Sequence, residues 1–121
     1  MNTVSGYAQT EIAGMNEAEL ESRALIKTAA ALNNVKENWE TSGNELAQAL
    51  EKNRKLWSIL ASAMTEEDCP QPKEVKQNII NLASFIFKRT IDVLAHPSPE
   101  KLDILININM NIARGLAGSA E

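Results

Sequence analysis

The sequence has little of the chemistry that catalysis and metal binding require, with one cysteine and one histidine among 121 residues. A single thiol cannot close an intrachain disulfide, and neither Cys69 nor His96 has a second soft ligand at the spacing of a metal site. A nucleophile needs a base within reach, yet His96 precedes a Pro-Ser-Pro turn and Cys69 lies in an acidic loop. We therefore predict a protein from a reducing compartment that is not an enzyme and holds no metal or cofactor.

Long apolar runs and an excess of positive charge are absent as well. No stretch approaches the roughly 20 apolar residues that span a bilayer, and the N-terminus lacks the basic flank and the apolar segment of a signal peptide. The 12 Lys and Arg residues against 16 Asp and Glu residues give a net charge of −4. This balance argues against nucleic acid as a direct ligand. We expect a cytoplasmic protein with no membrane partner.

The chain does have apolar residues at the spacing of amphipathic helices, and its length suits one domain. Residues 1–15 have mostly short side chains, so we expect a flexible arm there, with Tyr7 as its one anchoring group. Residues 16–121 are predicted to form a single helical domain. The predicted fold is all-α: a four-helix bundle or a related helical array with a flexible N-terminal arm.

Capping boxes predict where the first two helices begin. The first helix is predicted to begin at Asn16, because a glutamate follows three residues later. We expect that helix to end near Thr41. Ser42 begins a second box of the same kind, and Gly43 supplies a flexible joint. Because the connection is so short, the two helices should be antiparallel neighbours.

Prolines predict the bounds of the other two helices. The third helix is expected over residues 72–95, because Pro72 fits a first turn and the proline-rich segment that follows disfavours helix. The pair Ser98-Pro99 is a good N-cap and first-turn combination for the fourth helix. A closing glycine, Gly115 or Gly118, predicts where that helix stops.

An asparagine occupies one position in the apolar seam of the second predicted helix and one in the seam of the fourth. These residues are Asn53 and Asn109. If the two amides meet across the core, the polar pair fixes the register of the helices. Alternatively, Asn109 satisfies the backbone of a partner. We favour the first interpretation.

Two other stretches admit a functional interpretation beside a structural one. The third predicted helix has more apolar residues than one buried side requires. Either it is central and touches several neighbours, or part of it, including Phe85 or Phe87, lies in a groove open to a partner helix. Residues 51–57 interleave basic groups with Trp57, a composition that suits nucleic-acid contact. Since Trp57 lies in the seam and the lysines point away from it, a solvated face is the favoured interpretation.

Four short stretches occur in order along nearly the whole chain: residues 7–10 (YAQT), 53–57 (NRKLW), 77–90 (QNIINL running on to FKRT) and 105–116 (LININMNIARGL). Together they resemble the FlaF family of flagellar biosynthesis regulators, small proteins of alphaproteobacteria. The resemblance implies a non-catalytic cytoplasmic regulator that binds flagellin as a secretion chaperone. It also implies a role in flagellin synthesis and filament assembly, opposite FlbT, a repressor of flagellin synthesis.

The family does not define its binding residues, so the expected binding site comes from the third predicted helix and the arm. We expect an amphipathic flagellin segment in a groove between helices, with the arm over the groove when it is empty. The predicted binding residues are aromatic anchors, cations at the rim of the groove and amides that form hydrogen bonds: Tyr7, Asn78, Asn81, Phe85, Phe87, Lys88 and Arg89.

Two rival functions remain open at this point. One is a translational regulator that contacts flagellin mRNA through basic residues of the second and third helices, or that acts on an mRNA-binding partner such as FlbT. Its basic residues would be Lys52, Lys55, Lys88 and Arg89. The other is a homo-oligomer in which the apolar excess of the third helix pairs with its own copy.

Overall fold

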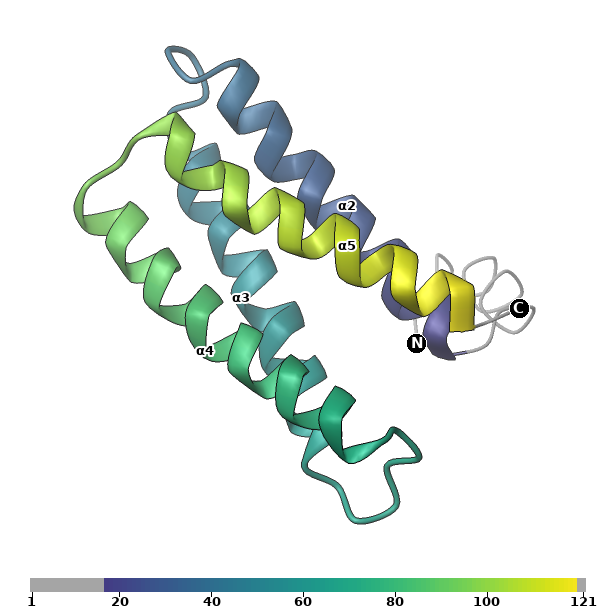
Figure 1. The fold of residues 1–121 in the computed structure, drawn as a ribbon. Coiled ribbons are helices and arrows are strands. Elements are labelled where there is room, and N and C mark those ends of the chain that lie inside the picture. The colour runs from purple at the N-terminus through teal and green to yellow at the C-terminus, as the bar shows by residue number, and fades with distance from the viewer. Residues whose placement is uncertain (1–16, 120–121) are drawn as a thin grey trace, which may run out of the picture.

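The structure is a computed structural model that describes residues 17–119 (Figure 1). This part of the chain contains helices and turns but no strand, which confirms the predicted all-α fold. The helices are α2 (Glu17–Glu37), α3 (Glu45–Met64), α4 (Lys73–Ala95) and α5 (Leu102–Ser119), with a short 3-10 helix, η1 (Pro99–Lys101), directly before α5. The predicted arm around Tyr7 lies outside the described residues, so its division from the helical domain stays a prediction.

The helices form two antiparallel pairs. Figure 1 shows α5 lying along α2 and α4 lying along α3, and α2 also contacts α3. Contacts between α4 and α5 are sparse, although these helices are consecutive in the chain. The interpretation that made the third helix central is therefore wrong, because α4 packs chiefly against α3. None of the helices within residues 17–119 is both long enough and apolar enough to cross a membrane.

The core is built from the inward-facing stripes of the four helices. Each stripe recurs at spacings of three and four, so it stays on one side of its helix. The largest fully buried apolar side chains come from all four helices: Leu25, Leu32, Val35, Leu50, Trp57, Ile86, Val93, Leu102 and Leu105. Burial of a side chain of this size contributes roughly 1.5–3 kcal/mol, so these residues supply most of the drive to fold.

The connection between α2 and α3 differs from the predicted capping box. α2 ends at Glu37 rather than near Thr41, and turns follow it. Gly43 has a φ of 48°, in the left-handed region that favours glycine, so its predicted role as the joint is confirmed. The predicted cap at Ser42 is wrong: its Oγ donates to the Trp39 carbonyl oxygen (3.3 Å), and the N-cap position belongs to Asn44. The Ser42 carbonyl oxygen accepts a hydrogen bond from the Glu45 N–H at the start of α3 (2.9 Å), but the Ser42 side chain is turned back toward Trp39.

The connection between α4 and α5 is fastened by Lys101. Its Nζ donates to the His96 carbonyl oxygen (2.7 Å) and pairs with the Asp92 carboxylate (3.1 Å). Pro99 occupies the first turn of η1, whereas the Ser98 hydroxyl donates to the Glu100 carboxylate (2.9 Å) and caps no backbone group. α4 and α5 are thus held together at this end, and Figure 1 shows that they diverge toward the other end of the bundle.

Candidate functional site

A groove of about 580 Å³ lies between the first half of α4 and the second half of α5. It is at the end of the bundle where the two helices diverge, away from the connection that Lys101 fastens. Its lining combines apolar side chains with amides from both helices and from the loop before α4: Gln71, Glu74, Val75, Asn78 and Ile79 on one side, and Asn111, Ile112, Gly115 and Leu116 on the other. Such a mixture is typical of a site that binds an amphipathic segment.

The α4 wall of the groove continues along the helix toward its C-terminal end. Val75, Asn78, Leu82, Phe85 and Arg89 recur at spacings of three and four, so they share one side of α4. The first two of these residues line the groove, and the others extend the same wall. Val75 is 40% exposed and Phe85 is 37% exposed, so α5 leaves part of this apolar surface uncovered.

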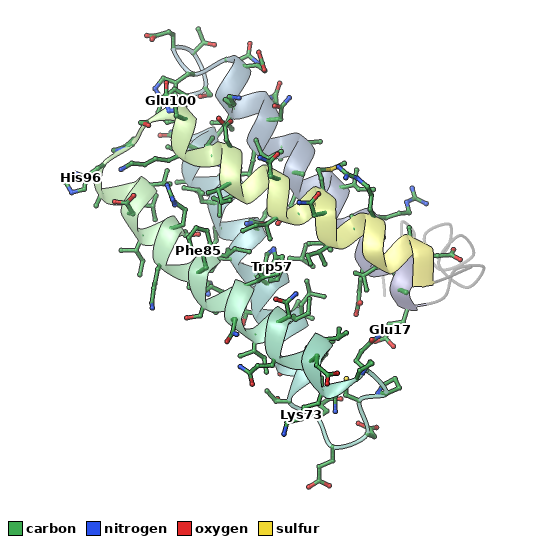
Figure 2. The ribbon with its side chains drawn as sticks, viewed as in Figure 1. Glu17, Trp57, Lys73, Phe85, His96 and Glu100 are labelled. Atoms are coloured by element: carbon green, nitrogen blue, oxygen red, sulfur yellow. The ribbon has the colours of Figure 1, made fainter. Side chains whose placement is uncertain are left out.

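Arg89 adds a positive charge to that wall. Its guanidinium carbon lies 5.5 Å from the centroid of the Phe85 ring, a cation–π contact. Figure 2 shows Phe85 near the middle of α4. The contact holds the arginine along the wall, where it is available to an acidic side chain of a ligand.

The α5 wall is formed by residues that sequence analysis did not single out as a binding surface. Ile104, Ile108, Asn111 and Gly115 recur at spacings of four and three, and the last two line the groove. Ile104, which is 38% exposed, shares this side of α5 but lies in its first turn, near Lys101 and outside the groove. The available signal was the width of the apolar arc on this helix, which exceeds the seam through Leu105 and Asn109.

A buried hydrogen-bond network joins α2, α3 and α5. The indole Nε1 of Trp57 donates to Asn109 Oδ1 (2.8 Å), and Asn109 Nδ2 donates to Asn53 Oδ1 (2.7 Å) and Thr28 Oγ1 (2.8 Å). Trp57, Asn53 and Asn109 are fully buried. The contact predicted between Asn53 and Asn109 is therefore present. It ties three helices into one frame, against which α4 packs through α3.

One donor in this network has no acceptor. Asn53 Nδ2 is buried and makes no hydrogen bond with any residue that the structure describes. A buried donor without an acceptor lowers stability, because its hydrogen bonds to water are lost on folding. The Asn53–Asn109 pair therefore fixes the register of the helices but lowers the stability of the fold.

The other predicted binding residues lie elsewhere on α4. Phe87 is partly buried and packs against the core, and it is about 200° around the helix from Phe85. Lys88 is exposed on the outer side of α4, and Asn81 accepts a hydrogen bond from Gln77 (2.9 Å) at the solvent edge. The structure thus brings Asn78, Phe85 and Arg89 onto one wall of the groove but directs Phe87 and Lys88 to other sides.

The basic stretch of α3 offers no stacking surface for a base. Lys52 and Lys55 are exposed, but the Trp57 ring between α3 and α5 is fully buried (Figure 2). Arg54 is paired with Glu51 on the same helix (2.6 Å), which raises the pKa of Arg54 and lowers that of Glu51 through their shared hydrogen bond. Aromatic stacking beside phosphate contacts is therefore missing from this surface.

A second hollow, of about 400 Å³, lies between the start of α2 and the loop after α3. Its lining includes the acidic residues Glu17, Glu21, Glu66 and Asp68, and the free thiol of Cys69. Burial, and to a smaller degree the charge of Glu17, raises the pKa of Glu21. Within residues 17–119 no three His, Cys, Asp or Glu side chains are placed to hold a metal ion.

We expect Glu21→Gln to stabilise the fold at pH 7 and to have no stabilising effect in acid. A carboxyl whose pKa is raised on folding favours the folded state only while it is protonated, and that contribution is lost as the pH rises through the raised value. Glutamine resembles the protonated form at every pH. The gain should be at most about 0.5 kcal/mol because the site is partly solvated. Thermal unfolding at pH 4 and at pH 7.5 checks this, and an equal shift in Tm at both values would contradict it.

Comparison with known proteins relates the chain to one family. A family model described as "Flagellar protein FlaF" matches residues 3–116, which is nearly the whole chain. No curated protein and no solved structure matches the chain significantly.

Proposed function

The chain belongs to the FlaF family of flagellar proteins, and on that basis we propose that it binds flagellin as a secretion chaperone, with one amphipathic flagellin helix in the groove between α4 and α5. Through this binding it promotes flagellin synthesis and filament assembly in the cytoplasm. The observation that supports the proposal most is a groove with apolar residues on both walls: Val75, which is 40% exposed, on α4, and Ile112 and Leu116 on α5.

The dimensions of the groove suit a helix. The α4 wall runs from Val75 to Phe85, ten residues, which is about 15 Å of helix or nearly three turns. An amphipathic helix presents its apolar residues at spacings of three and four, so three turns of it cover a wall of this length. The residues that line the groove come from two helices, and one helix laid between them would bury both walls at once.

The physical purpose of such binding follows from the state of an unassembled subunit. A helix whose apolar face awaits its neighbours in a filament is exposed to water before assembly, and exposed apolar faces associate with one another. A groove lined by apolar residues and amides covers that face reversibly. Arg89 at the rim favours a helix with an acidic residue at the matching position.

The test is the interaction of the purified full-length chain with monomeric flagellin, measured by size-exclusion chromatography and calorimetry. We expect a one-to-one complex with a Kd of about 1 μM or tighter. No retained flagellin, under conditions in which a known flagellin chaperone retains it, would contradict the proposal. Binding of flagellin mRNA that weakens steeply with salt, in the absence of flagellin binding, would instead favour a translational regulator.

A further inference from the structure

The segment that precedes α2 joins the bundle beside the groove. Glu17, the first residue of α2, lines the hollow of about 400 Å³ between α2 and the loop after α3. Gln71, near the end of that loop, lines both this hollow and the groove between α4 and α5. Figure 2 shows Glu17 at the same end of the bundle as Lys73, the first residue of α4. Residues 1–16, which lie outside the described part of the chain, are therefore attached one hollow away from the groove.

This segment is long enough to reach into the groove and along it. An extended chain spans about 3.3 Å per residue, so the stretch from Tyr7 to Glu17 can cover about 33 Å. Residues 74–79, the part of α4 that lines the groove, occupy only about 8 Å of helix. The surplus length is available to cross the hollow between Glu17 and Gln71.

The composition of residues 1–16 suits the lining of the groove. Glu11 is their one charged side chain, and the others are glycine, apolar residues or residues with hydroxyls and amides. The groove likewise combines apolar side chains with amides. A segment of this kind buries few charges, so it avoids most of the desolvation cost that a charged segment would incur. Tyr7, the single tyrosine of the chain, is its largest side chain and its natural anchor.

We propose that residues 1–16 occupy the groove in the free protein, with the Tyr7 ring between Val75 on α4 and Ile112 on α5. A buried tyrosine hydroxyl requires a hydrogen-bond partner, and the Asn78 amide in the α4 wall supplies one. The segment thereby covers the apolar lining of the groove and competes with any ligand for it. Docking of Tyr7 is independent of flagellin, but the competition with flagellin rests on the proposed function.

Fluorine NMR of the full-length chain tests the docking. Because Tyr7 is the single tyrosine, incorporated fluorotyrosine gives one signal that reports on this residue alone. In the free protein we expect the signal of a buried ring, with little difference between H₂O and D₂O. Val75→Glu should move it to the position of free fluorotyrosine. Ile91→Glu, the same kind of change on an exposed residue outside the groove, should leave it where it is.

Two results would overturn the docking. One is a wild-type signal at the position of free fluorotyrosine, or a buried signal that Val75→Glu does not change. The other is a signal that depends on protein concentration, because it would place Tyr7 in the groove of a second copy. A concentration-independent buried signal that only the groove variant releases supports the proposal.

The competition is tested by adding flagellin and by removing the anchor. Flagellin should release the Tyr7 signal. If the segment is docked nine-tenths of the time, Tyr7→Ser should tighten flagellin binding about tenfold. Gln9→Ala, a control in the same segment, should bind within about twofold of the wild type. Flagellin binding that leaves the Tyr7 signal buried would overturn the competition. If Tyr7 is docked but the chain binds no flagellin, the proposed function fails and the docking stands.

Discussion

Asn109→Leu is expected to lower the free energy of unfolding by about 3–4 kcal/mol, the largest loss we predict for a single substitution. Asn109 accepts the hydrogen bond of Trp57 Nε1 and donates to Asn53 Oδ1. Leucine has a similar shape, but it leaves the indole N–H and the Asn53 carbonyl buried without partners. Each such group costs about 1–3 kcal/mol. Urea unfolding followed by circular dichroism measures the change.

Asn53→Leu is the matched control, and the effect should be far smaller. Asn109 Nδ2 keeps Thr28 Oγ1 as an acceptor when Asn53 is removed, and the substitution eliminates the unsatisfied Asn53 Nδ2. We expect a change of less than about 1 kcal/mol, in either direction. Equal losses for the two leucine variants would contradict the hydrogen-bond network as described, because they would show that both amides contribute alike.

The double substitution Val75→Glu with Phe85→Ala is expected to weaken flagellin binding at least about a hundredfold. It places a carboxylate on the apolar α4 wall and removes the aromatic anchor over which Arg89 lies. Both residues are more than one-third exposed, so the free energy of unfolding should fall by less than about 1 kcal/mol. Calorimetric titration with flagellin measures the affinity, and thermal unfolding verifies the fold.

The control places the same two kinds of change on the opposite flank of α4. Ile91→Glu with Leu94→Ala alters residues that are 69% and 52% exposed, which is more apolar exposure than at the groove. If exposed apolar area alone attracted flagellin, this control would lose more affinity than the groove variant. We expect it to bind within about twofold of the wild type. A larger loss of affinity in the control would show that flagellin binds outside the groove.

The helices and the buried amide pair could be predicted from the sequence, because both follow from local spacing. The seam positions of Asn53 and Asn109 placed both amides in the core before any contact was known, and the two do meet. The α2–α3 corner shows where such patterns fail. A serine three residues before a glutamate has the form of a capping box, yet the left-handed turn at Gly43 directs Ser42 back toward Trp39.

The groove could be predicted only in part, because periodicity shows which residues share a side of a helix but not which side a neighbour covers. Phe85 and Phe87 were equal candidates in the sequence, and only the sparse packing of α4 on α5 distinguishes them. The α5 wall was missed for the same reason. Ile112 and Leu116 have the spacing of core residues, and their place beside an open groove depends on how α4 is attached.

Methyl NMR of the full-length chain, titrated with unlabelled flagellin, tests most directly whether the groove is the binding surface. Each exposed or partly exposed methyl-bearing residue reports on its own place in the bundle, so bound and free surfaces are distinguished in one experiment. We predict that flagellin shifts the methyl signals of the groove residues Val75, Ile112 and Leu116. If the signals of the groove residues are unchanged and shifts are confined to Ile59, Ile91 and Leu94, on the outer surfaces of α3 and α4, the groove is not the binding surface.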